Sequence, residues 1–191
     1  GPGTSTRLVL GLSQAQIVSV ETSRPWFRRY QREFGDDPRV DLRLRDVGWD
    51  MEALADDVGR GFDLVFVDGG ARQEALFESR SLVSPGGVVV VHDAHRDDYY
   101  WAMSRYRYLF PPERHSCIVT DDADAFRTVV RGIEPDHDTH SVYTRKPYRR
   151  AYFDDLVARS RRDQRDVGLV PEGDDAHDSA SCSRSTPVGW G

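Results

Sequence analysis

Acidic and histidine side chains stand at the ends of several apolar runs in this sequence. The run FDLVFV is followed by Asp68, and the run VVVV is followed by His92 and Asp93. Glu21 ends the run QIVSV. Carboxylates beside apolar strands are costly unless they are paired or used. If these runs are parallel strands, their carboxyl ends meet at one edge of the sheet, where open α/β sheets bind ligands.

A glycine turn near the start of the chain adds a second kind of chemistry. GPGTST contains Gly3, and glycines allow a ligand to approach the backbone before a helix N-terminus offers its free N–H groups. Glu21 comes 18 residues after Gly3, and an acid at that distance can accept hydrogen bonds from a ribose diol. Asp46 and Val47 follow RVDLRLR. They could bind an exocyclic amine and its ring, or Asp46 could be a turn or capping residue.

The elements that must position these residues follow from the alternation of apolar and amphipathic stretches. This alternation predicts a parallel sheet covered by helices. We expect strands at 16–20, 39–45, 62–67 and 88–92, with the two last ones buried on both faces.

Beyond these strands, a helix is expected over 97–109. Two strand-like runs at 116–120 and 126–130 are expected to form an antiparallel pair at the sheet edge. The predicted organisation is a domain over 1–134, an extension over 135–159 and a disordered polar tail over 160–191.

Five motifs carry a resemblance to a known family, in this order and spacing: GPGTST, VE, RDV, FDLVFVDGG and LVSPGGVVVVHDA. Together they resemble the class I S-adenosylmethionine-dependent methyltransferases, over residues 1–132. The resemblance implies an α/β, Rossmann-like, doubly wound and mostly parallel sheet. It also implies transfer of a methyl group from S-adenosylmethionine to an acceptor. The VDGG and HDA endings are similar to the small-molecule methyltransferases of the family, with a hydroxyl oxygen as the first expectation for the acceptor.

The resemblance also implies roles for particular residues. One set of residues would bind the parts of the cofactor, which are its methionine, its ribose, its adenine and its methyl side. A second set of residues would contact the acceptor. The cofactor residues are Gly1, Gly3, Thr4 and Ser5 for methionine, Glu21 and Thr22 for ribose, Asp46 and Val47 for adenine, and Asp68 and Gly69 for the methyl side. The expected catalytic residues are His92, Asp93 and His95.

Three departures from the family pattern alter these expectations. The family's opening strand should precede Gly1 and does not occur in the sequence, so we expect a truncated, N-terminally incomplete chain that is itself inactive. Ala71 and Arg72 stand where many relatives have a histidine, which removes one candidate base. Asp68 and Asp93 could share a divalent ion, but two ligands are too few to predict a metal site.

Two other function classes compete with the methyltransferase interpretation. A nicotinamide-dependent oxidoreductase shares the glycine turn and the acid, but its G-x-G-x-x-G pattern requires glycine where this chain has Thr6. A degenerate cofactor-binding domain without activity is the non-enzymatic alternative. Its support is the missing strand and the departure at Ala71.

Charge and cysteine content bear on partners and location. The formal net charge of -6 gives no electrostatic reason to bind nucleic acid or an anionic membrane. Cys117 and Cys182 are not spaced like a zinc site or a redox pair, so both are expected to be free thiols in the cytoplasm. A small-molecule acceptor is the expected partner, and a homodimer is left open.

Overall fold

The computed structural model describes residues 2–46, 54–69, 72–113, 115–135 and 147–171 of the 191 residues. Helices and strands alternate along most of this length. In chain order they are α1 (Thr4–Leu12), β1 (Ile17–Glu21), α2 (Arg24–Phe34), β2 (Val40–Leu44), α3 (Leu54–Val58), β3 (Phe62–Val67), α4 (Arg72–Leu82), β4 (Val83–His92), the 3-10 turn η2 (Asp97–Tyr99), α5 (Tyr100–Met103), β5 (Tyr108–Phe110), β6 (Ser116–Thr120), α6 (Ala123–Gly132) and α7 (Pro147–Asp166).

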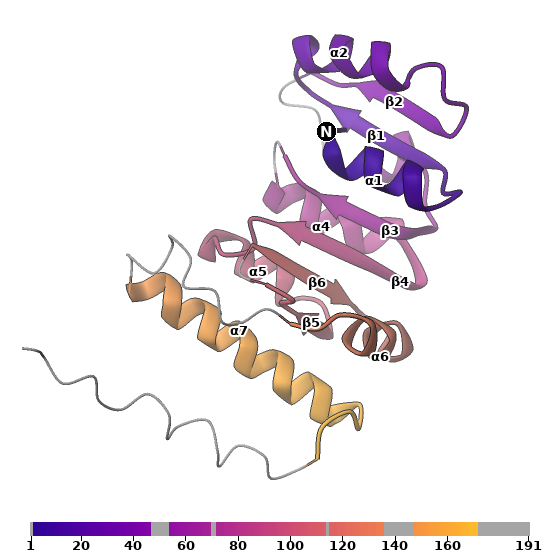
Figure 1. Ribbon diagram of the computed structural model, residues 1–191. Coiled ribbons are helices and arrows are strands. Elements are labelled where there is room, and N and C mark those ends of the chain that lie inside the picture. Colours follow the sequence, from indigo (N-terminus) through magenta and orange to yellow (C-terminus); the bar gives the residue numbers. More distant parts are fainter. Residues whose placement is uncertain (1, 47–53, 70–71, 114, 136–146, 172–191) are drawn as a thin grey trace, which may run out of the picture.

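The strands confirm the predicted α/β, Rossmann-like class. β1 pairs with β2 in parallel, and a second group has the order β3-β4-β6-β5. β3 and β4 are parallel, whereas β6 runs antiparallel to both β4 and β5. The arrows of β1 to β4 point the same way in Figure 1. The carboxyl ends of these four strands therefore lie toward one side of the molecule.

Helices cover both faces of the four-stranded sheet. Val89 and Val91 of β4 face a core that includes Leu76 of α4, Met103 of α5 and Leu156 of α7. The alternate residues Val88 and Val90 face the other side, where Phe126 of α6 packs. Successive side chains of a strand point to opposite faces. The apolar run VVVV is therefore used by two separate cores, as expected for a strand covered on both sides.

The edge strand β3 is less buried than expected. Leu64 and Phe66 of β3 are 51% and 38% exposed, so the prediction that β3 is buried on both faces is wrong. β3 is hydrogen-bonded to β4 alone in the described part of the chain. A strand at a sheet edge has fewer neighbours to cover it, which accounts for the exposure.

The segment after β4 also differs from its prediction. In place of one helix over 97–109, the chain forms η2 and the single turn α5, and then enters β5 at Tyr108. Residues 126–130 are not a strand but part of α6. Asp122 caps that helix, because its carboxylate accepts from the N–H groups of Asp124 and Ala125 at 2.9 and 2.8 Å. The antiparallel edge pair is therefore β5 with β6.

The last described helix crosses an expected boundary. α7 runs through Ser160, where the tail was predicted to begin, and continues to Asp166. Leu156 and Asp163 of this helix are buried against the sheet edge. A buried stripe on an otherwise polar helix has little weight in composition, which is why the polar sequence suggested disorder. Residues 172–191 of the predicted tail lie outside the described residues.

Within the ranges that the structure describes, no helix has the length and apolar character needed to cross a membrane. Cys117 is a free thiol, as predicted, and burial raises its pKa. Cys182 lies outside the described residues.

Candidate functional site

The strand register brings two of the predicted catalytic residues, His92 and Asp93, close to the predicted cofactor residue Asp68. Val67 of β3 pairs with Val91 of β4, so the next residue along each strand places Asp68 beside His92. His92 in turn pairs with Ser116 of β6. Asp93 thus comes opposite His115, and the following backbone N–H, that of Ala94, donates to the His115 carbonyl at 2.9 Å.

His92 lies between two carboxylates. Its Nδ1 is 3.2 Å from Oδ1 of Asp68 and 3.6 Å from Oδ1 of Asp93. The imidazole is 41% exposed, so a ligand can reach it. Nδ1 is the ring nitrogen that faces both carboxylates, and it makes no hydrogen bond within the described part of the chain. An exposed imidazole at this position is a candidate for proton transfer.

Arg72 joins the same two carboxylates from the first turn of α4. Its Nη1 donates to Oδ2 of Asp93 at 2.7 Å, and its Nη2 donates to Oδ1 of Asp68 at 2.9 Å. The side chain is only 17% exposed. Burial acts to lower the pKa of Arg72, but Tyr99, Asp93 and Asp68 together outweigh it and raise the pKa. A guanidinium therefore neutralises part of the negative charge at this strand edge.

No role was predicted for Arg72 from the sequence, where it was noted only because it stands at a position at which many relatives have a histidine. A signal was present in the spacing, because Arg72 follows Asp68 by four residues across a strand-to-helix turn. That spacing brings an acid and a base together once the helix starts. The second carboxylate, on Asp93, could be found only from the strand pairing.

Asp93 adopts an unusual backbone conformation. Its φ is +57°, and it is the one non-glycine residue with positive φ in the described part of the chain. Such a conformation is uncommon outside glycine and occurs at functional sites, where the surrounding contacts hold it. Here the ion pair with Arg72 and the Ala94 hydrogen bond to His115 hold the turn.

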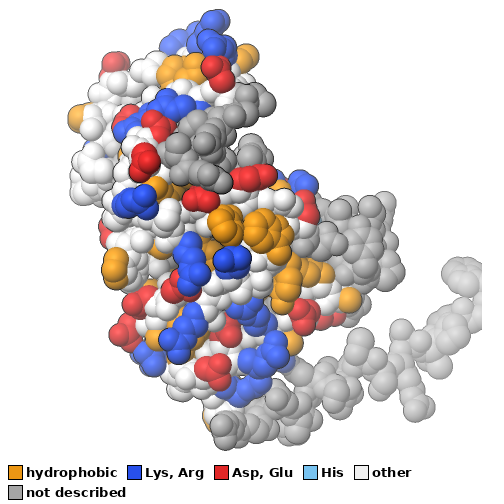
Figure 2. Space-filling view, turned by 180° about the vertical axis from the view of Figure 1, so that it is seen from behind, with side chains coloured by type: hydrophobic (Ala, Val, Ile, Leu, Met, Phe, Trp, Pro, Cys, Tyr) orange, Lys and Arg blue, Asp and Glu red, His pale blue; other side chains and the backbone are white. Residues whose placement is uncertain are grey.

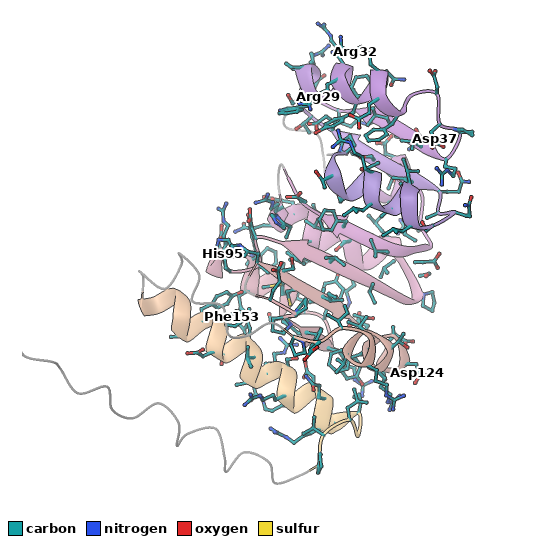
Figure 3. All side chains as sticks on the ribbon, in the orientation of Figure 1. Arg29, Arg32, Asp37, His95, Asp124 and Phe153 are labelled. Atoms are coloured by element: carbon teal, nitrogen blue, oxygen red, sulfur yellow. The ribbon has the colours of Figure 1, made fainter. Side chains whose placement is uncertain are left out.

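His95, the third predicted catalytic residue, lies near Asp93 and packs against His115. It is 9% exposed, and its ring meets that of His115 edge to face at a centroid distance of 5.2 Å. Figure 3 places His95 at the end of the sheet near α7, the helix that carries Phe153. His115 was not singled out from the sequence, because it precedes β6 and has no motif of its own.

Glu21 ends β1 and is held by the backbone that follows it. Its Oε1 accepts from the N–H groups of Thr22 and Ser23, both at 2.8 Å. A carboxylate has two oxygens and about four acceptor sites. Oε2 is therefore oriented but has capacity left to accept from a ligand.

The glycine turn leads into a helix as predicted. α1 begins at Thr4, and the Gly3 N–H donates to Oγ1 of Thr6 at 3.2 Å. Thr6 is 7% exposed, so the position that a dinucleotide fingerprint reserves for glycine holds a buried threonine. Thr4 and Ser5 lie in the first turn, where N–H groups have no partner inside the helix. Gly1 lies outside the described residues.

The adenine-side predictions are only partly covered. Asp46 follows β2, is 81% exposed in its side chain and pairs with Arg24 at 2.9 Å. Arg24 begins α2, so Asp46 lies beside the segment that follows Glu21. Val47 lies outside the described residues. Gly69 has a φ of +140°, which allows the turn from β3 toward α4.

A shallow polar hollow of about 400 Å³ opens beside the Arg72 group. Its walls come from both sides of the strand edge: Gly69, Arg72, Gln73, Glu74, Arg96, Asp98 and Tyr99. Arg96 also lies over the Tyr99 ring at 5.0 Å. The hollow is thus lined by charged groups and one phenol, which suits a polar ligand.

Comparisons with known proteins were made over the whole chain. No family model and no curated protein matches it. Among solved structures it is similar to a methyltransferase from Geobacter sulfurreducens, with 20% identity over 54% of this chain and 56% of that one and a TM-score of 0.39. It is also similar to a predicted O-methyltransferase from Agrobacterium tumefaciens, with 15% identity over 62% and 69% of the two chains and a TM-score of 0.42. The chain spans little more than half the length of the first.

Proposed function

We propose that this chain belongs to an enzyme that transfers a methyl group from S-adenosylmethionine to a hydroxyl oxygen of a small polar acceptor. The observation that carries the proposal is the approach of His92 Nδ1 to Asp68 at 3.2 Å, next to Arg72, which pairs with Asp68 and lines a polar hollow. A half-exposed imidazole next to a carboxylate is the arrangement of a general base. The five sequence motifs support the cofactor.

The described residues fit the cofactor at two points. Oε2 of Glu21 is free to accept from the two ribose hydroxyls, because the neighbouring N–H groups engage Oε1. The first turn of α1, with Thr4 and Ser5, offers N–H donors to the carboxylate of the methionine part. When bound, S-adenosylmethionine supplies a methyl group on a positively charged sulfur.

The chain's own residues would then act on the acceptor. The hollow at Gly69, Arg72 and Tyr99 would hold and orient the polar acceptor. His92 would take the proton of the acceptor's hydroxyl group, and bound S-adenosylmethionine would supply the methyl group that replaces this proton. Asp68 and Asp93 would stabilise the resulting imidazolium. S-adenosylhomocysteine would be the by-product, and the proton would pass from His92 to solvent.

Calorimetry with S-adenosylhomocysteine tests the cofactor assignment. We expect micromolar binding that Glu21→Ala weakens at least tenfold, about 1.4 kcal/mol. Glu134→Ala, at an exposed position away from the strand ends, is the matched control and should leave the affinity unchanged. A folded protein that binds no S-adenosylhomocysteine, or that binds NADH instead, would sink the proposal. Binding without methyl transfer to any hydroxylated acceptor would favour a degenerate cofactor-binding domain.

A further inference from the structure

Three side chains with metal-ligand chemistry lie together at the end of β4. Asp93, His95 and His115 each offer one ligand atom, and these atoms all lie within 4.8 Å of one another. The three residues come from two segments, the turn after β4 and the residue before β6. The backbone hydrogen bond from Ala94 to His115 fixes the two segments against each other.

We propose that Asp93, His95 and His115 form a binding site for a divalent transition-metal ion, with zinc as the expected occupant. Two imidazoles and one carboxylate suit zinc, and magnesium and calcium prefer oxygen ligands alone. Three protein ligands and one water complete a tetrahedral shell. The site shares Asp93 with the Asp68–Asp93 pair, in which Arg72 donates to Oδ2 of Asp93 and to Oδ1 of Asp68.

The geometry requires only a small closure. Zinc bonds of about 2.0–2.1 Å place tetrahedral ligand atoms roughly 3.4 Å apart. The largest separation in the group is thus within about 1.4 Å of that value, given the 4.8 Å limit. His115 directly precedes β6 and is half-buried, and its ring already contacts the ring of His95. Because Arg72 donates to Oδ2 of Asp93, the ligand oxygen would be Oδ1, which lies 3.6 Å from Nδ1 of His92.

Local charge favours a cation at this position. Asp68 and Asp93 bring two negative charges, and Arg72 supplies one positive charge against them. His95 is 9% exposed, so it is largely withdrawn from water before any ion binds. A rigid, partly dehydrated imidazole loses little conformational freedom on binding a metal. Tyr152 of α7 also holds the turn after β4, because its hydroxyl donates to the Ala94 carbonyl at 3.2 Å.

The site does not depend on the proposed methyl transfer, because metal binding is measured without cofactor or acceptor. Tag-free protein stripped with chelator is titrated with Zn²⁺ alone by calorimetry, and with Co²⁺ by visible absorption. We expect one equivalent of Zn²⁺ to bind, with Mg²⁺ binding at least a hundredfold more weakly. His115→Asn should weaken Zn²⁺ binding at least tenfold, and His95→Asn should do the same.

Two controls separate this site from its neighbours. His92→Asn changes a histidine that lies beside Asp93 but outside the group, and should alter Zn²⁺ affinity less than twofold. His177→Ala removes a histidine of the C-terminal residues, which the structure does not describe. Circular dichroism and thermal unfolding in chelator establish that each variant is folded, and His115→Asn is the least disruptive because His115 is half-buried. No Zn²⁺ binding by the wild type overturns the proposal, as does an equal loss in His92→Asn or His177→Ala.

Discussion

The guanidinium of Arg72 donates to the carboxylate of Asp93 at 2.7 Å, so the first turn of α4 is tied to the end of β4. A second donation, to Asp68 at 2.9 Å, ties the same turn to the end of β3. One side chain therefore holds two strand ends that would otherwise present adjacent like charges. His92 and the polar hollow both lie against this arrangement, so its loss should affect stability and activity together.

Removing this guanidinium should destabilise the fold. Arg72→Met keeps most of the side-chain volume but leaves Asp68 and Asp93 without their shared donor. Because Arg72 is only 17% exposed, we expect a loss of about 1–3 kcal/mol in the free energy of unfolding. Urea unfolding at pH 7 measures it. Arg96→Met, at an exposed pair with Asp98, is the control and should change stability by less than about 0.5 kcal/mol. Equal effects of the two variants would contradict the bridging role.

The proposed base should be separable from cofactor binding. His92→Gln keeps a polar side chain but cannot accept the acceptor's proton near neutral pH. We expect kcat to fall by about 10²–10⁴-fold, with the affinity for S-adenosylhomocysteine unchanged. Glu21→Ala should instead act on the affinity. A His92→Gln enzyme with full activity would remove His92 from the mechanism.

The buried carboxyl group of Asp163 on α7 should make the stability of the fold depend on pH. Asp163 is 8% exposed, and its Oδ2 accepts from the Leu109 N–H at 2.9 Å. Burial raises the pKa of Asp163 above its ordinary value. The folded state therefore holds the proton more tightly than the unfolded state. This group's contribution to stability is fully present below the unfolded pKa of about 3.9 and is lost as pH rises through the folded pKa.

Asp163→Asn isolates this effect, because the amide oxygen still accepts from Leu109 and carries no charge. Between about pH 4 and pH 7, the stability of the wild type should fall relative to Asp163→Asn. Asp163→Ala should be less stable than both by about 1–3 kcal/mol, since it leaves the buried N–H without its acceptor. Thermal unfolding across this pH range measures all three proteins. Parallel curves for wild type and Asp163→Asn would show that the pKa of Asp163 is not raised.

A glycine in β4 should be intolerant of any side chain. A Cβ at Gly87 would lie 2.6 Å from Cγ2 of Val83 and 2.8 Å from the carbonyl oxygen of Phe62, at the irregular part of the β3–β4 ladder. Gly87→Ala should cost about 1–3 kcal/mol. Gly132→Ala, with no atom within 4 Å of the new Cβ, should leave stability unchanged or slightly raised. Denaturant unfolding of both variants decides, and a harmless Gly87→Ala would mean that the strands can separate locally.

Much of the architecture could be predicted from periodicity. The central strands and the turn at Gly3 were found because each has a strong local signal, an apolar run or a glycine. Residues 126–130 could not be assigned correctly, since FRTVV suits a strand and a helix equally. Two contacts stabilise the helix. Asp122 caps its N-terminus, and the ring of Phe126 stacks on the ring of Tyr108 at a centroid distance of 5.1 Å.

In the candidate site too, some features could be predicted from the sequence and others only from the fold. Strand endings in the sequence predicted that Glu21, Asp68, His92 and Asp93 lie toward one edge of the sheet, because parallel strands end at one edge whatever their order. Only the tertiary structure decided which residues meet. Arg72 reaches Asp93 because β3 and β4 are adjacent, and His115 reaches it because β6 inserts antiparallel beside β4. Strand order is set by long-range packing and not by local sequence, so the residues that contact Asp93 could be identified only from the tertiary structure.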